Sequence, residues 1–361
     1  MTITNLSREN PSSETTPVAN GTNAVAIGSG AAANGQHSFS IGQNTVSGTT
    51  GGNNYAVAIG YAATGTGAFS TSVGGFTDAT AQHALAVGTY AQATGVRSSS
   101  IGRALASGAD SFASSLTSTS SSYGAQGASS VAIGKEAKAT GAGSIALSTK
   151  TYAGGAAATG SGSVAIGDGA AASGLLGMAI GRGATASGIM SMAYGRDSQA
   201  TQEESKAFGY RSYSDVTGCF AYASGYFGAA NGDAQGRQYI LRKATTDATA
   251  TVLTTDAGNG TANNQIKVPT NSVVVFDGVI TACQSGVAAY AGWRVEGMIT
   301  NDGGTTVIQN NTITAIKNES GWRCRLSAND STDSLVVTVT GEASHNIRWV
   351  ANIRTVETIY A

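Results

Sequence analysis

The sequence predicts an all-β protein in which a parallel β-roll of 14-residue coils is followed by an antiparallel β-sandwich or jelly-roll knob. Three observations predict this fold. A short sequence motif that ends in Gly recurs at a nearly constant interval for about 200 residues. Within each motif apolar residues alternate with Ala, and a period of two residues is the period of a β-strand. Beyond residue 238 the repeat stops, and eight or nine apolar runs follow between turn signals without a helical pattern.

The composition excludes several classes of protein. The 361 residues include 50 Gly but only 3 Pro, and 11% are charged, against about 25% in an average chain. Because 41% of the residues are hydrophobic and the net charge is -1, we expect the chain to fold. The 20 Lys and Arg are balanced by 21 Asp and Glu, so there is no overall basic excess and we expect no nucleic-acid partner.

Residues 1–20 are polar and contain Pro11 and Pro17. They lack the apolar run of a secretory signal, and we expect them to form an attachment segment that is not exported. No run reaches the roughly 18 apolar residues of a membrane helix, so we also expect no membrane insertion.

The β-roll is predicted over residues 21–228, with 14 repeats. Ten of the thirteen steps between closing positions are 14 residues, and the other three are 18, 18 and 19. The extra residues fall at 49–54, 117–123 and 151–157, where we expect protruding loops. The closing turn residues are Gly28, Gly42, Gly60, Gly74, Gly88, Gly102, Gly134, Gly167, Gly181, Gly195 and Gly209, with Leu116, Ser148 and Ala223 as departures that suggest altered turns.

Each coil is predicted to hold two short strands and two tight turns. A strand such as Val25 to Ile27 precedes the closing Gly, and about seven residues later a second Gly recurs, as at Gly35. Gly suits such turns because it adopts positive φ without steric cost. We expect Val and Ile to fill one side of the interior and Ala the other. Coils this thin bury little surface, so we expect a homotrimer in which further surface is buried between chains.

The repeat units resemble a known family. SSVAIGKEAKATG (Ser129 to Gly141) and GSVAIGDGAAASG (Gly162 to Gly174) are similar to the head repeats of trimeric autotransporter adhesins. The resemblance implies a left-handed parallel β-roll that assembles as a homotrimer. We expect the repeat to serve here without the signal peptide, coiled-coil stalk and membrane anchor of that family.

A Gly-rich neck at residues 229–238 is predicted to lead into a β-sandwich knob at 239–361. The alternation places each Trp on an apolar face, which favours core packing over an exposed platform for sugars. The other face of each of these strands carries charged residues, which form either a solvated surface or a layer of ion pairs between subunits. The Trp residues are Trp293, Trp322 and Trp349, and the charged residues are Arg294, Glu296, Arg323, Arg325, Arg348 and Arg354.

The knob also carries a resemblance. VVVFDGVITA, AAYAGWRVEGMIT and VVTVTGEASHNIRWVANIRTVE are similar to a C-terminal module of bacteriophage tail fibres. The resemblance implies a trimeric tail fibre, assembled in the host cytoplasm, that docks on a tail or baseplate protein through residues 1–20. In the virion such a fibre would bind a host-surface glycan or protein. The alternatives are a bacterial trimeric adhesin head, a passive spacer or decoration protein, and a polysaccharide-cleaving tailspike.

We expect no enzyme, cofactor or metal site. Glycoside hydrolysis needs two facing carboxylates, and no coil offers an obvious pair, although a pair across chains stays open. Three His residues lie far apart and no nucleophile elbow is present. The acids of the β-roll are Asp78, Asp110, Glu136, Asp168, Asp197, Glu203, Glu204 and Asp215, and the His residues are His37, His83 and His345. Cys219, Cys283 and Cys324 have no metal-ligand spacing and are expected to be small buried thiols, with a Cys283–Cys324 disulfide left open.

Overall fold

The computed structural model describes residues 15–52, 55–115, 122–149, 154–228 and 230–360. Every regular element in these ranges is a β-strand, as predicted. Most of the predicted attachment segment, Leu116 and parts of the three insertions (53–54, 117–121 and 151–153) lie outside the described residues. The prediction that Leu116 closes its coil is wrong by one residue, because Ser115 is the residue that pairs with Gly102. The chain forms two compact units, Met1–Leu176 and Gly177–Ala361.

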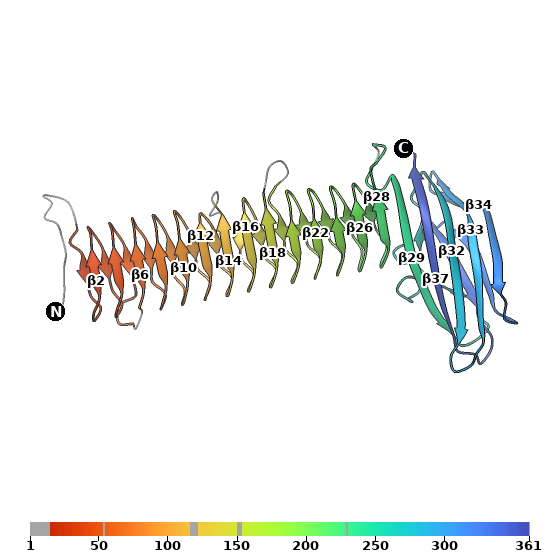
Figure 1. The fold of residues 1–361 in the computed structure, drawn as a ribbon, viewed down its shortest axis with the longest axis horizontal. Helices are drawn as coiled ribbons and strands as arrows, with labels where there is room; N and C mark the ends of the chain where they lie inside the picture. The colour runs from red at the N-terminus through yellow and green to blue at the C-terminus, as the bar shows by residue number, and fades with distance from the viewer. Residues whose placement is uncertain (1–14, 53–54, 116–121, 150–153, 229, 361) are drawn as a thin grey trace. The chain divides into compact units, whose positions relative to one another are not determined.

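The first unit consists of stacked coils, each with one longer and one two-residue strand (Figure 1). Each strand pairs in parallel with the equivalent strand one coil later, as Val131 does with Ile145. The predicted parallel β-roll is therefore confirmed. The longer strands are β2 Val25–Ile27, β4 Phe39–Ile41, β6 Val57–Ile59, β8 Thr71–Val73, β10 Leu85–Val87, β12 Ser99–Gly102, β14 Phe112–Ser115, β16 Val131–Gly134, β18 Ile145–Ser148 and β20 Val164–Ile166. The short strands are β1 Val18–Ala19, β3 Ala32–Ala33, β5 Val46–Ser47, β7 Thr64–Gly65, β9 Asp78–Ala79, β11 Gln92–Ala93, β13 Leu105–Ala106, β15 Gly124–Ala125, β17 Lys138–Ala139, β19 Ala157–Ala158 and β21 Ala171–Ala172.

The interior of the coils is filled by Ala and Ser from both strands. Ala58 and Ala86 of longer strands and Ala79 of a short strand are fully buried. The prediction that Val and Ile fill one side of the interior is wrong, because they point outward and stay partly exposed. Because side chains alternate between the two sides of a strand, either Ala and Ser or Val and Ile must face the interior. The two strands of a coil lie so close together that only the smaller Ala and Ser side chains fit between them.

The backbone conformation and the close approach of the next coil require Gly at the closing positions. All eleven have positive φ, from 78° at Gly102 to 136° at Gly74. A Cβ added at Gly134 would lie 1.9 Å from the carbonyl oxygen of Ser148 in the next coil. At the other corner the left-handed residue is often not Gly, as at His37 and Phe69.

The second unit begins with further coils and then changes direction. Its coil strands are β22 Met178–Ile180, β23 Thr185–Ala186, β24 Met192–Tyr194, β25 Gln199–Ala200, β26 Lys206–Gly209, β27 Tyr213–Ser214 and β28 Phe220–Ala223. The next strand, β29 (Ala234–Thr245), runs antiparallel to β28, with Phe220 opposite Gln238. The parallel ladder therefore ends on a paired strand, and its last edge is covered.

Two antiparallel sheets form the rest of this unit, which confirms the predicted sandwich. The first has the order β29-β37-β32-β33-β34 (Figure 1), and in the second β36 pairs with the three other strands. The strands are β30 Thr251–Val252, β31 Ile266–Lys267, β32 Ser272–Gln284, β33 Tyr290–Asp302, β34 Thr305–Lys317, β35 Arg323–Asn329, β36 Ser334–Thr340 and β37 Ile347–Ile359.

The three Trp side chains lie in the core between these sheets. Trp349 stacks on Trp293 with ring centroids 5.7 Å apart and lies 5.8 Å from Trp322. All three are almost fully buried, so core packing is confirmed and the exposed sugar platform is wrong. Val216 and Cys219, from the last coil, belong to the same core cluster.

The Cys residues differ in exposure. Cys219 is buried, Cys324 is partly buried and Cys283 is exposed, and all three are free thiols, so the open Cys283–Cys324 pair is not a disulfide. The expectation of buried thiols is wrong for Cys283, because its position on β32 faces outward. Across the described ranges, no helix has the length and apolar character needed to cross a membrane.

Candidate functional surfaces

The first unit carries two outward rows of side chains on its longer strands, which we call the outward strip. One row holds Val25, Phe39, Val57, Thr71, Leu85, Ser99, Phe112, Val131, Ile145 and Val164. The other holds Ile27, Ile41, Ile59, Val73, Val87, Ile101, Ser114, Ile133, Leu147 and Ile166. Parallel register places equivalent residues of successive coils directly beside each other.

The outward strip is apolar and has no partner within the described chain. Ile101 is 42% exposed and Ile133 is 40% exposed. Ten strands at about 4.8 Å per strand make a strip roughly 45 Å long. A contiguous exposed apolar surface of this kind marks an interaction site.

Aromatic rings stack along one corner of the first unit. His37, Tyr55, Phe69 and His83 occupy successive coils, with centroids 4.8, 5.1 and 5.0 Å apart and nearly parallel planes. A second ladder at the other corner contains Phe76 and Tyr90, 5.0 Å apart. Because ring faces cover each other, mainly ring edges meet solvent, and stacking of sugars is limited to the ends of each ladder.

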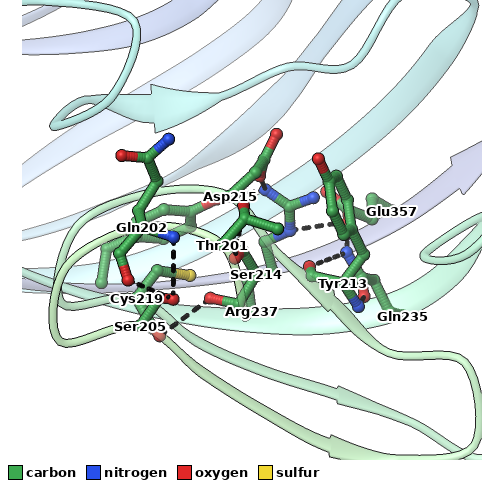
Figure 2. Close-up of polar contacts among 11 residues, drawn as sticks. Thr201, Gln202, Ser205, Tyr213, Ser214, Asp215, Cys219, Gln235, Arg237 and Glu357 are labelled. Atoms are coloured by element: carbon green, nitrogen blue, oxygen red, sulfur yellow. Dashed lines mark hydrogen bonds and ion pairs between the residues drawn. The ribbon is translucent and has the colours of Figure 1, made fainter. Parts of the chain in front are cut away.

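The second unit contains a buried ionic cluster, which we call the ionic joint (Figure 2). The guanidinium of Arg237 on β29 donates from Nη1 to Oδ1 of Asp215 at 2.7 Å, and its Nε lies 2.9 Å from Oε1 of Glu357 on β37. Gln235 also donates to Glu357, and its side chain makes two hydrogen bonds with the backbone of Tyr213. The joint thus ties the last coil to both β29 and β37.

The electrostatics of the ionic joint follow from one cation facing two carboxylates. The side chains of Arg237 and Glu357 are 1% and 0% exposed. Burial raises the pKa of Glu357, the charge of Asp215 adds to this rise, and the guanidinium of Arg237 and the amide of Gln235 oppose it without cancelling it. Removal of the cation would leave two carboxylates close together with no counter-charge.

The position of the ionic joint gives it a structural role. It lies where the coils end, beside Cys219, whose carbonyl accepts a hydrogen bond from Ser214 at 3.0 Å. Burial raises the pKa of the Cys219 thiol to about 12. A repeat array needs a cap on its last coil, and the sandwich core supplies one here.

A polar hollow of about 570 Å³ opens on the side of the first sheet that faces away from the core. Arg354 pairs there with Asp277, with Nη2 and Oδ2 2.5 Å apart. Arg294 and Glu296 line the same hollow, and within the described residues neither side chain has a hydrogen-bond or ion-pair partner. Arg323 and Arg325 belong instead to β35 of the second sheet.

The remaining acids and His residues do not converge on a site. Asp110 pairs with Arg97 on an exposed corner, Asp197 lies near Arg196 and Arg211, and Asp215 is in the ionic joint. His37 and His83 lie in one aromatic ladder, and His345 contacts Glu342. Among the described residues, no group of three or more His, Cys, Asp or Glu could hold a metal ion.

Several coils are similar to a known repeat family. A family profile described as the YadA head domain repeat, in two copies, matches seven segments of the chain. These segments are similar to adhesin head repeats. They span residues 19–45, 79–104, 125–147, 154–170, 158–184, 172–198 and 186–212.

No curated protein matches the chain. Among solved structures, one match is the tailspike protein gp49 from Acinetobacter baumannii bacteriophage Fri1, a capsular polysaccharide depolymerase. It has 10% sequence identity and a TM-score of 0.25, and the match covers 94% of this chain and 70% of the tailspike.

Proposed function

We propose that this protein is a homotrimeric tail fibre of a bacteriophage that attaches the virion to a glycan or protein on the host-cell surface. The observation that carries the proposal is the outward strip, which leaves the larger apolar side chains of every coil without a partner in their own chain. Similarity of the coils to YadA head repeats supports self-association with three copies around one axis.

The energetics favour burial of the outward strip. A strip about 45 Å long and about 10 Å wide presents about 450 Å² of surface per chain. At about 25 cal/mol per Å², its burial is worth on the order of 10 kcal/mol per chain before the cost of association.

The phage assignment rests on the resemblance of the C-terminal segments to tail-fibre modules. We propose that residues 1–20 dock on a tail or baseplate protein, that the fibre is assembled in the host cytoplasm, and that attachment proceeds without catalysis or a cofactor. Neither nucleic acid nor membrane insertion has a part in this function.

The self-association in this proposal is tested by one change on the strip. Ile133→Asp places a charge in the strip, and we expect the mass in solution to fall to that of one chain because the charge cannot be buried. Val96→Asp is the matched control, since Val96 is 38% exposed but lies on a corner outside the strip. An unchanged mass for both variants would remove the strip as the interface.

Attachment is tested by binding of the full chain to envelope fractions from a panel of bacteria. Saturable binding to some fractions is the expected result, without release of oligosaccharide. Absence of saturable binding throughout an adequate panel would favour the passive spacer. Release of oligosaccharide would favour a polysaccharide-cleaving tailspike.

A further inference from the structure

The outward rows of the second unit continue from the coils onto the sandwich. Ile180, Tyr194, Phe208 and Tyr222 lie side by side in successive coil strands, and Tyr222 lies opposite Gly236 of β29. The same row then crosses the first sheet through Val356, Val275 and Met298. One surface therefore runs without interruption from β22 to β33.

The part of this surface on β29, β37, β32 and β33 is called here the C-terminal face. It is the side turned away from the sandwich core, yet it is rich in apolar side chains. Val356 is 69% exposed and Val275 is 52% exposed. Ile240, Val279, Met298 and Val350 are exposed as well.

A charged row crosses the middle of the C-terminal face. Arg354 lies opposite Asp277, and Asp277 lies opposite Glu296. Arg354 pairs with Asp277, which leaves Glu296 beside a second carboxylate and without a cation among the described residues. Like charges directly opposite each other destabilise a sheet, so the position of Glu296 beside Asp277 is unfavourable in the single chain.

A cation lies on the same face of the same strand, but its side chain makes no ion pair with Glu296. Arg294 is two residues from Glu296, about 7 Å along β33, and within the described chain it is also unpaired. The face thus presents one unpaired cation and one unpaired anion in the polar hollow, and exposed apolar residues lie elsewhere on the same face. Such a surface is complementary to a second copy of itself.

We propose that the C-terminal face binds the C-terminal face of neighbouring copies, with Arg294 of one copy paired to Glu296 of the next. In a ring of identical chains each copy gives one cation and receives one, so every such charge is satisfied. The apolar side chains around the charged row exclude water from the pairs, which strengthens them. This inference rests on the proposed self-association and extends its interface from the coils to the sandwich.

The test compares Glu296→Arg with the double variant Arg294→Glu/Glu296→Arg in the full chain. All three Trp residues lie in the sandwich core, so Trp fluorescence follows the unfolding of this domain alone. Arg323→Glu on β35 is the control, because Arg323 is exposed on the other sheet. Light scattering on each protein reports its mass in parallel.

We expect the midpoint of the wild-type domain to rise with protein concentration. Glu296→Arg should lower the midpoint by roughly 5 °C or more, because two cations then meet between copies. The double variant should restore the midpoint, since the charges are exchanged and remain complementary. The control should leave it unchanged.

An increase, or no change, in the unfolding midpoint of Glu296→Arg would overturn the inference. In a sandwich that stands alone, Glu296→Arg would place a cation beside Asp277 of its own chain and would raise the midpoint or leave it unchanged. A hollow that binds a sugar instead would give no rescue by the double variant and no dependence on protein concentration. If the wild type is trimeric by mass and these results are found, only this inference fails, whereas a monomeric wild type removes the proposed self-association as well.

Discussion

Replacement of one closing Gly tests the geometry of the coils most sharply. Gly134 has a φ of +99°, and a Cβ there would lie 1.9 Å from the carbonyl oxygen of Ser148. Gly134→Ala therefore adds backbone strain of about 1–3 kcal/mol and a steric overlap of about 1–3 kcal/mol. We expect the free energy of unfolding to fall by roughly 2–6 kcal/mol, which is a large share of the typical 5–15 kcal/mol.

A matched control lies one turn away in the same region. Gly143 also has a positive φ, of +65°, but no heavy atom lies within 4 Å of an added Cβ. Asn adopts this conformation readily, as Asn23 does at the equivalent corner with a φ of 58°. Gly143→Asn should change stability by about 0.5 kcal/mol or less.

The assay is guanidinium chloride unfolding followed by the β-sheet signal in circular dichroism. We expect a lower midpoint for Gly134→Ala and a wild-type midpoint for Gly143→Asn. Equal midpoints for the two variants, or greater damage from Gly143→Asn, would refute the proposed contact between successive coils.

Three further predictions concern the second unit. In native protein only Cys283 should react rapidly with an alkylating reagent at pH 8, because burial raises the pKa of Cys219 to about 12 and of Cys324 to about 11, and mass spectrometry of native and unfolded protein checks this. Arg237→Met should cost about 3–5 kcal/mol in chemical unfolding, because it strands two buried carboxylates, whereas Arg97→Met at the exposed Arg97–Asp110 pair of the first unit should cost no more than about 1 kcal/mol. The pKa of Glu357 in the folded protein is raised above its ordinary 4.5, so the folded state binds the proton more tightly than the unfolded state does. The free energy of unfolding should therefore fall as the pH rises from 4.5 through the raised pKa. Glu357→Gln should abolish this pH dependence.

Much of the fold could be predicted because its signals are local. The spacing of the closing Gly residues and the alternation around Val131 set the coil and its strands within a few residues of sequence. The side on which Val131 lies could not be predicted, since period two does not say which set faces inward. The narrow space between the two strands of a coil decides that, and it is a tertiary property.

The candidate surfaces were less accessible from sequence. The aromatic ladder had a signal, because His37, Tyr55, Phe69 and His83 each lie five residues before a closing Gly. The ionic joint had only a weak one, in that Arg237 falls on the same side of β29 as Tyr239 and Leu241, which the core buries. Its partner Glu357 lies 120 residues further along the chain, and such pairing follows from topology alone.

The mass of the full-length wild-type protein in solution, measured by light scattering, tests the central claim most directly. The account predicts a single species at three times the chain mass of 35.8 kDa, because the outward strip must be covered by other copies. A stable monomer at 35.8 kDa, with the strip open to water, would contradict it.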